Sequence, residues 1–245
     1  MGATTALLEN EVRLLRRSPA VVIWSVVLPL AALLVMMAIP GARMSLPMLG
    51  GLSVLEAYQP TLVVFVATLL ALQMMPMFLG SYRESGFLRR LRATPAHPAN
   101  LLTAIVLMVL AVILAVGLLI LFLPLVVGVG DPRPLALAAL VLIACAITFL
   151  ALGTFLASIL PNPRVASGVG AAIAAVMWFF AGMWYPRAQF PDWLSNVADW
   201  TPGGAAATLL TNAAHGAELG WQPFVCLTAW TVVGLLVSVR TFRWE

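Results

Sequence analysis

The chain has 245 residues, of which 62% are hydrophobic and only 9% carry a charged side chain, and its formal net charge is +4. Soluble domains usually carry about 25% charged residues. A water-soluble globule of this length has no place to bury so much apolar surface, so the composition excludes that class and indicates an integral membrane protein.

The chemistry of the polar residues excludes several kinds of site. All 13 basic side chains are arginines, whereas a P-loop needs a lysine to reach the nucleotide phosphates. Cys145 and Cys226 lie in apolar runs and are typical of small buried residues. His97 and His215 lie in separate predicted loops, and no Cys/His cluster has the spacing of metal ligands. We therefore expect no metal, no bound cofactor and no enzymatic activity in this chain.

The first predicted element is an amphipathic helix at residues 3–18, which Pro19 separates from the first apolar run. Its apolar face carries Leu7, Leu8, Val12, Leu14 and Leu15, and its polar face carries Glu9, Asn10, Arg13, Arg16 and Arg17. A helix of this kind lies in the membrane interface, with Glu9, Arg13, Arg16 and Arg17 as its candidate surface residues. Packing on a soluble partner is the alternative.

Six runs reach the length of about 20 mostly apolar residues that a spanning helix needs. They are residues 20–40, 57–82, 101–130, 134–160, 165–186 and 219–239. Pro29 and Pro76 are predicted kinks in the first two. The fold class is therefore all-α, with six transmembrane helices in a single domain.

The arginines predict the orientation of these spans. If the N-terminus is inside, ten arginines fall in inner segments and three in outer segments. Inner loops are enriched in basic residues, so both termini are expected in the cytoplasm. A cleavable signal peptide would have a shorter apolar run of about 7–15 residues.

The most basic loop, residues 83–95, also has a helical pattern. Phe87, Leu88 and Leu91 share a narrow apolar arc, and Glu84 falls in the middle of that arc without a local counter-ion. A carboxylate there is costly unless it is paired, so Glu84 is expected to meet a partner from another segment or chain. The alternative is that the arginines only set topology and bind anionic lipid.

The segment 187–218 is the only long predicted outer stretch. Phe190, Trp193, Leu194, Val197 and Trp200 follow helical spacing, Thr201-Pro-Gly-Gly breaks that helix, and residues 205–214 form a second one. The pattern predicts a re-entrant helical hairpin, in which the backbone must be buried in protein or line a cavity. A flat interfacial helix with an aromatic belt is the alternative.

Weaker candidates lie inside the spans. Gln73 either lines a substrate path or bonds a neighbouring helix. Phe180 and Met183 make the outer half of the fifth span bulky, which suits lipophilic cargo or lipid contact equally. The small residues 167–170 indicate close helix packing.

Two stretches resemble one known family, the ABC-2 type permeases. Residues 83–95, R-E-S-G-F-L-R-R-L-R-A-T-P, resemble its E-x-G-x-hydrophobic-x-x-hydrophobic-x-x-x-P stretch after the second span. Residues 179–202, F-F-A-G-M-W-Y-P-R-A-Q-F-P-D-W-L-S-N-V-A-D-W-T-P, are similar to its glycine, proline, P-x-W and T/N-P series before the last span. The resemblance covers essentially the whole chain and is strongest to the drug exporters that include the daunorubicin-resistance permeases. One departure follows Pro202, where two glycines and three alanines replace bulky residues.

The resemblance implies the membrane subunit of an ABC exporter in a bacterial cell membrane, with a hydrophobic drug, antibiotic or lipid-like cargo. Residues 83–95 would be the coupling helix that docks on a separate ATP-binding subunit. Its implied contact residues are Arg83, Glu84, Gly86, Phe87, Leu88, Arg89, Arg90, Leu91 and Pro95. The hairpin would cap the path, for which the candidates are Gln73, Phe180, Met183, Phe190, Trp193 and Trp200.

The implied partners are two ATP-binding subunits, which would carry ATP and Mg, and a second permease subunit that is either a copy of this chain or a related one. Membrane lipids are expected contacts and nucleic acid is not. Two other functions stay open from the residues alone. One is a non-transporting scaffold or sensor subunit, and the other is an intramembrane hydrolase that uses Ser167 and His215.

Overall fold

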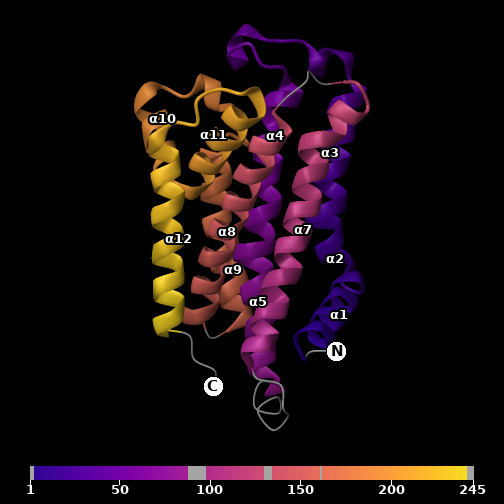
Figure 1. The fold of residues 1–245 in the computed structure, drawn as a ribbon, viewed down its shortest axis with the longest axis vertical. Coiled ribbons are helices and arrows are strands. Elements are labelled where there is room, and N and C mark those ends of the chain that lie inside the picture. Colours follow the sequence, from indigo (N-terminus) through magenta and orange to yellow (C-terminus); the bar gives the residue numbers. More distant parts are fainter. Residues whose placement is uncertain (1–2, 88–97, 130–133, 161, 242–245) are drawn as a thin grey trace.

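A computed structural model describes residues 3–87, 98–129, 134–160 and 162–241. Within these residues, six helical stretches are long and apolar enough to cross a membrane. Figure 1 shows them side by side, with both ends of the chain at the same end of the bundle. We call this the terminal end, and the opposite end, where α10 (Asp192–Asp199) and α11 (Pro202–His215) lie, the hairpin end. The chain is an all-α, multi-pass membrane protein.

The spanning stretches include single helices and two composite ones. The first contains α2 (Pro19–Val22), the π-helical segment η1 (Ile23–Val27) and α3 (Leu28–Ala38), and the second contains α4 (Val54–Thr68), the π-helical segment η4 (Leu69–Met74) and α5 (Met75–Glu84). The others are α7 (Pro98–Val126), α8 (Leu135–Ile159), α9 (Pro163–Phe180) and α12 (Trp221–Thr241). Helix α1 (Ala3–Arg16) precedes them, and short 3-10 turns follow α3 (Pro40–Arg43, Pro47–Leu49) and α9 (Arg187–Gln189).

The second span begins earlier than its predicted range of 57–82. Ser53 caps the helix: its hydroxyl accepts a hydrogen bond from the backbone N–H of Glu56, and the Glu56 carboxylate accepts one from the backbone N–H of Ser53. This reciprocal pair satisfies two N–H groups that the helix itself leaves unbonded. The helix therefore starts at Val54, one turn before the uninterrupted apolar run.

The fifth span ends earlier than its predicted range of 165–186. Helix α9 stops at Phe180, and Gly182 has a left-handed backbone with φ of 91°. Glycine adopts this conformation without the steric cost that a β-carbon imposes. The aromatic residues after Gly182 therefore lie in a turn at the hairpin end and not in the spanning helix.

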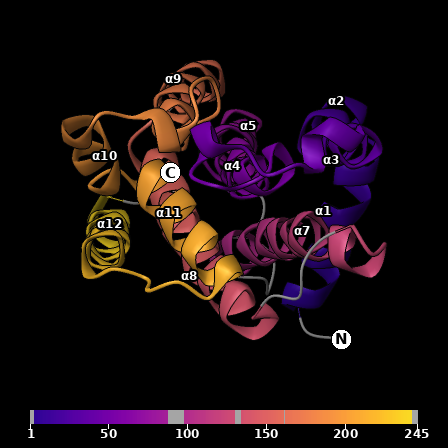
Figure 2. The same cartoon turned by 90° about the horizontal axis from the view of Figure 1, so that it is seen from above.

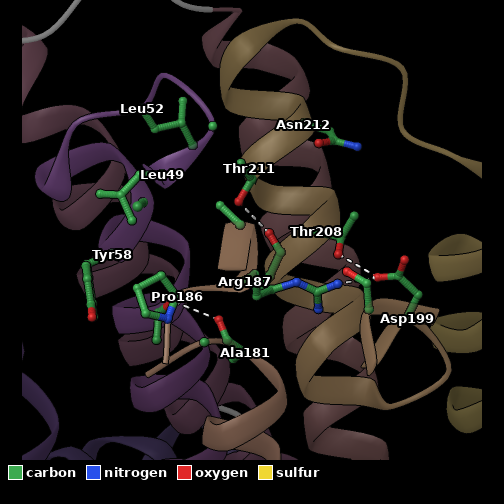
Figure 3. A pocket seen from close by; sticks show the side chains of 17 residues that line it. Leu49, Leu52, Tyr58, Ala181, Pro186, Arg187, Asp199, Thr208, Thr211 and Asn212 are labelled. Atoms are coloured by element: carbon green, nitrogen blue, oxygen red, sulfur yellow. Dashed lines mark hydrogen bonds and ion pairs between the residues drawn. The ribbon is translucent and has the colours of Figure 1, made fainter. Parts of the chain in front are cut away.

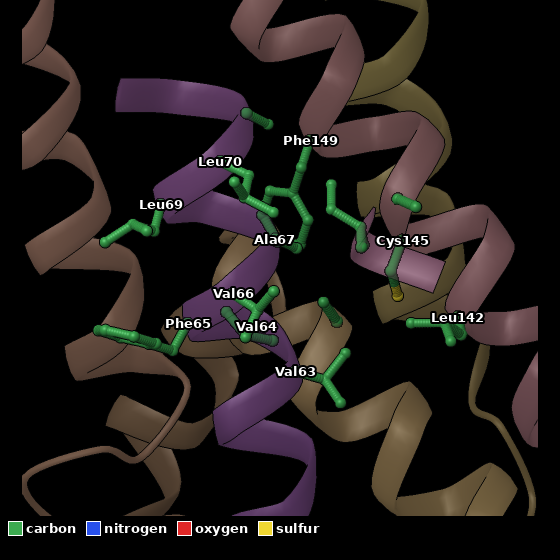
Figure 4. Close-up of a cluster of buried hydrophobic side chains, with 14 of the residues drawn as sticks. Val63, Val64, Phe65, Val66, Ala67, Leu69, Leu70, Leu142, Cys145 and Phe149 are labelled. Atoms are coloured by element: carbon green, nitrogen blue, oxygen red, sulfur yellow. The ribbon is translucent and has the colours of Figure 1, made fainter. Parts of the chain in front are cut away.

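The second span is the centre of the bundle. Its most apolar window is 78% buried, whereas the corresponding windows of the first, fifth and sixth spans are each 28% buried. Figure 2 shows α4 and α5 surrounded by α3, α7, α9 and α11. Figure 4 shows part of the core, where Leu70 of η4 lies near Phe149 of α8. The outer spans leave most of their apolar surface for lipid or for another subunit.

The predicted kinks at Pro29 and Pro76 appear as π-helical turns, η1 and η4, that end shortly before each proline. A proline has no N–H to donate to the carbonyl four residues earlier, which disturbs the regular helix at that point.

At η4 the neighbouring helices come very close. A β-carbon on Gly170 of α9 would lie 1.9 Å from the Leu72 carbonyl oxygen, and one on Gly153 of α8 would lie 2.1 Å from that of Ala71. Only glycine fits at either place.

The last span is held to α8 by hydroxyl pairs. The hydroxyls of Thr148 and Thr231 are 2.8 Å apart, and those of Ser158 and Thr241 are 2.6 Å apart. Hydroxyl groups on apolar helices commonly bond neighbouring helices in this way. The pairs set the register of α12 along α8.

Helix α11 is embedded among spanning helices and packs on α4, α8, α9 and α12. Small residues make this possible. A β-carbon on Gly203 would lie 2.4 Å from the Met177 carbonyl oxygen, and one on Gly204 would lie 2.2 Å from that of Ala198. The glycines and alanines that depart from the family pattern thus allow α11 to enter the bundle. Burial of this backbone in protein is what a re-entrant helix requires.

Candidate functional site

The coupling segment, residues 83–95, does not form one continuous helix from its start. Arg83 and Glu84 are the last residues of α5, and Gly86 has a left-handed φ of 65° before the backbone becomes helical again at Phe87. A left-handed residue ends an α-helix. Glu84 therefore does not share one continuous helix with Phe87, contrary to the prediction, while Leu88 and Leu91 lie outside the described residues.

The side chain of Glu84 is exposed. Its predicted burial on an apolar arc does not occur, and a solvated carboxylate needs no counter-ion, so the physical reason for expecting a hidden partner disappears. Contact with another subunit remains a prediction for Glu84. The other predicted contact residues, Leu88, Arg89, Arg90, Leu91 and Pro95, lie outside the described residues.

The buried acid at this end is Glu11 of α1, which sequence reasoning missed. Its side chain is only 3% exposed, and the Tyr82 hydroxyl of α5 donates a hydrogen bond to its Oε1 atom at 2.6 Å. Burial raises the pKa of Glu11, and the hydrogen bond from Tyr82 opposes that rise. A signal was present, because Glu11 stands four residues from Leu7 and from Leu15, on the apolar face of the helix.

The Glu11–Tyr82 contact continues into the coupling segment. The rings of Tyr82 and Phe87 lie 5.1 Å apart, centroid to centroid. Arg83 is half-buried and donates from Nη1 to the backbone carbonyl of Ala157 in α8 at 2.7 Å. Helices α1, α5 and α8 are thus joined at Tyr82 and Arg83, where the coupling segment begins. The contact of Arg83 holds α5 to α8.

The predicted surface residues of the N-terminal helix behave as its pattern indicates. Glu9, Arg13 and Arg17 are exposed, while the side chain of Arg16 lies outside what the structure describes. Leu7, Leu8, Val12 and Leu15 of the predicted apolar face pack against the bundle, mainly on α7. Leu14, predicted for the same face, is instead 42% exposed. The polar face is free to meet lipid head groups or another protein, so both predicted alternatives remain open.

The candidate path residues do not converge on one site. Gln73 lies in η4, half-buried, and within the part of the chain that the structure describes its amide forms no hydrogen bond to a neighbouring helix. Phe180 and Met183 are half-buried near the end of α9, and Phe190 is buried and stacks on Tyr185. The described residues therefore give no support to the alternative that Gln73 forms a hydrogen bond to a neighbouring helix of the same chain.

Trp193 of α10 and Trp200, the residue that follows this helix, are both exposed. Trp193 is 67% exposed and Trp200 is 48% exposed, the latter in edge contact with Trp221 of α12. They do not pack with Phe190 as one cluster. Their position is that of aromatic side chains at a membrane interface.

The hairpin end instead has a charged centre that the sequence did not reveal. Arg187 donates from Nη2 to Asp199 Oδ1 at 2.7 Å and from Nη1 to the Phe180 carbonyl at 3.1 Å, and Thr208 donates to the same Asp199 oxygen at 2.7 Å. Figure 3 shows the Arg187 side chain reaching across to Asp199 and Thr208. These contacts join the turn after α9 to both helices of the hairpin.

The hydrolase interpretation fails on geometry. Ser167 lies near the start of α9 at the terminal end, and His215 is the last residue of α11 at the hairpin end. A nucleophile and its base must lie within hydrogen-bond reach. In the described residues, moreover, no three His, Cys, Asp or Glu side chains are grouped as metal ligands.

A comparison with models of protein families matches residues 2–213 to the ABC-2 type transporter family. The chain belongs to the ABC-2 type transporter family. A comparison with curated protein sequences found no significant match. The ABC-2 match covers the coupling segment, the central second span and most of the hairpin, so this chain is a transporter permease, a membrane component that is not itself catalytic. Permeases of this family generally pair with an ATP-binding subunit.

Proposed function

We propose that this permease is the membrane subunit of an ATP-driven exporter in a bacterial cytoplasmic membrane. The observation that carries the proposal is the family match over residues 2–213. In this arrangement both termini and the coupling segment face the cytoplasm. The excess of arginine in the segments at the terminal end supports this orientation.

The contacts at the terminal end support a role in transmitting force. A coupling segment that docks on an ATP-binding subunit must move together with the spans above it. The hydrogen bonds Tyr82–Glu11 and Arg83–Ala157 tie the start of the segment to α1 and α8. Movement of the segment would therefore be passed to three helices at once.

The complete exporter would contain two permease subunits and two ATP-binding subunits, with ATP and Mg bound only by the latter. The cargo class we propose is a hydrophobic drug, antibiotic or lipid-like molecule. Support comes from the apolar spans and from half-buried Phe180 and Met183 near the hairpin end. The amide of Gln73, for which the described residues offer no hydrogen-bond partner, would face the cargo or the second permease.

The test is reconstitution of the tagged permease with its ATP-binding subunit in proteoliposomes. We expect ATP hydrolysis that a hydrophobic fluorescent dye stimulates, and uptake of the dye that requires hydrolysable ATP. ATP hydrolysis that no hydrophobic compound alters, together with no dye transport, would instead indicate a scaffold or sensor subunit.

Substitutions in the coupling segment test the docking surface. Leu91→Asp places a charge on the predicted apolar arc and should abolish co-purification of the ATP-binding subunit. Arg92→Ala is the matched control, because the helical projection places Arg92 off the predicted apolar arc, where loss of a surface charge would typically cost at most about 1 kcal/mol. Equal retention of the partner by both variants would mean that the segment is a topology signal and not a docking surface.

A further inference from the structure

A cavity of about 360 Å³ lies at the hairpin end. Two stretches far apart in sequence enclose it: the loop before α4 with the first turns of α4, and the turn after α9 with the α10–α11 hairpin. Pockets for small organic ligands typically measure about 300–1,000 Å³. The cavity is therefore large enough for a small ligand, and it lies at the opposite end of the bundle from the coupling segment.

The cavity has two unlike sides. Figure 3 shows Leu49 and Leu52 on one side and Thr208, Thr211 and Asn212 of α11 on the other. The first side offers carbon surface, and the second offers hydroxyl and amide groups. A ligand that fits both must itself be amphipathic.

The polar side presents acceptors. The Thr208 hydroxyl donates its hydrogen to Asp199, and the Thr211 hydroxyl donates to the Ala207 carbonyl at 2.8 Å. The Asn212 amide nitrogen donates to the Glu218 carbonyl at 2.8 Å. A hydroxyl has two lone pairs beside its one hydrogen, and an amide oxygen only accepts. Ligand groups that donate hydrogen bonds therefore find several acceptor oxygens on this side.

The charges of the lining cancel. Arg187 and Asp199 are the two ionised side chains in the lining, and they form an ion pair at 2.7 Å. A charged ligand would lose its hydration without gaining a free counter-charge, which is unfavourable in a partly buried site. The cavity therefore selects against both anions and cations.

We propose that this cavity binds an uncharged amphipathic molecule whose polar part carries hydroxyl donors, such as the sugar end of a glycosylated aromatic compound. The polar part would bond Thr208, Thr211 and Asn212, and the apolar part would contact Leu49 and Leu52. If the protein is an exporter as proposed above, the cavity is a site that cargo occupies on leaving the transporter. Binding of the amphipathic molecule to the cavity does not depend on that proposed function.

Cysteine protection in the permease alone tests the proposal. Native Cys145 and Cys226 are buried in the bundle, so Ser195→Cys, in the cavity lining, can be labelled selectively by a polar maleimide in lipid nanodiscs. Phenyl β-D-glucopyranoside is the probe, and at ten times its dissociation constant it should slow labelling about tenfold. Phenyl phosphate and phenyltrimethylammonium should not slow it. Ala217→Cys, exposed at the same end but outside the lining, is the control that no probe should protect.

A second variant tests the role of the ion pair. Asp199→Asn keeps an acceptor for Thr208 but leaves the charge of Arg187 uncompensated. In the Ser195→Cys background this variant should gain protection by phenyl phosphate while the ammonium probe stays ineffective. Elution as a single folded species in size-exclusion chromatography is required of every variant before labelling.

Three results would overturn the proposal: no protection by the glucoside, equal protection by the charged probes in the parent, or equal protection at Ala217→Cys. The measurement uses neither ATP nor an ATP-binding subunit. Its failure would therefore leave the export proposal standing, and failure of dye transport in proteoliposomes would leave a positive binding result standing.

Discussion

At the scale of single residues, the most informative side chain is Glu11. A buried carboxylate is tolerated only when donors compensate for its lost hydration, and here Tyr82 supplies one hydrogen bond. The pair joins the N-terminal helix to the central span next to the coupling segment. The contribution of this pair to the free energy of unfolding can be measured by removing either partner.

Tyr82→Phe should lower the free energy of unfolding by about 1–3 kcal/mol, because it leaves a buried acceptor without its donor. In a Glu11→Gln background the same change should cost less, since a neutral amide is cheaper to leave unbonded than a carboxylate. Thermal unfolding of the four proteins in the same detergent completes the double-mutant cycle. Equal losses in both backgrounds would show that the two side chains do not interact.

The same residue predicts a pH dependence. Burial raises the pKa of Glu11 in the folded protein above its ordinary value of 4.5. A raised pKa means that the folded state binds the proton more tightly, so this contribution to stability is full below the ordinary value and is lost as pH rises through the folded value. We expect the Tm difference between Glu11→Gln and the parent to grow in favour of the variant as pH rises over that window. A constant difference across this window would contradict burial of the carboxylate.

The hairpin offers a matched pair of aromatic residues. Phe190 is 8% exposed and Trp193 is 67% exposed. Phe190→Ala should destabilise the protein by about 3–5 kcal/mol, because it opens a cavity, whereas Trp193→Ala should change stability by no more than about 0.5 kcal/mol. Tm values in detergent would show this contrast. If Trp193→Ala nevertheless reduces transport, its role is functional and not structural.

At the scale of elements, the close contacts around η4 decide how the central span is held. Its π-helical turn brings the carbonyls of Ala71 and Leu72 against Gly153 and Gly170. Such short approaches suit weak Cα–H···O contacts, and they leave no room for any side chain. The α8–η4–α9 packing therefore depends on two glycines and not on large apolar side chains.

Gly170→Ala should prevent normal packing of α9 and strongly reduce the yield of folded protein. Gly168→Ala is the control on the same helix, because a β-carbon there meets nothing within 4 Å. Alanine is favoured over glycine inside a helix by about 1 kcal/mol, so the control should be neutral or slightly stabilising. The Tm and the folded yield after purification distinguish the two. Similar values for both variants would contradict the close approach.

At the scale of the whole molecule, an even number of spans places both termini at one end, beside the coupling segment, and the hairpin at the other. This arrangement separates the proposed contact with the ATP-binding subunit from the cavity at the hairpin end. Any coupling between them has to pass along the spans, of which the central second one reaches from Val54 to Glu84.

The orientation is tested with single cysteines in intact cells. Ala217→Cys at the hairpin end should react with a membrane-impermeant maleimide added outside, and Ser85→Cys, near the start of the coupling segment, should react only after the cells are opened. Both positions are exposed in the structure. The reverse pattern of labelling would overturn the proposed orientation.

The sequence by itself determined the features that depend on local composition. Six long apolar runs, the amphipathic N-terminal helix and the proline that follows each π-helical turn are all readable because a spanning helix satisfies its own backbone hydrogen bonds within one segment. Length, periodicity and charge therefore suffice to predict an all-α membrane protein, and the resemblance of residues 83–95 and 179–202 to a known family adds the ABC-2 type.

Only the tertiary structure decided which polar groups meet. Glu11 and Tyr82 are 71 positions apart in sequence, and the helical projection of residues 83–95 could not reveal that Gly86 interrupts it or that Glu84 is exposed. The Arg187–Asp199–Thr208 contacts and the cavity beside them also depend on how α11 enters between four helices. The physical reason is that a buried charge is stabilised by whatever partner the packing brings within about 3 Å, and packing between distant segments leaves no periodic trace in the sequence of either one.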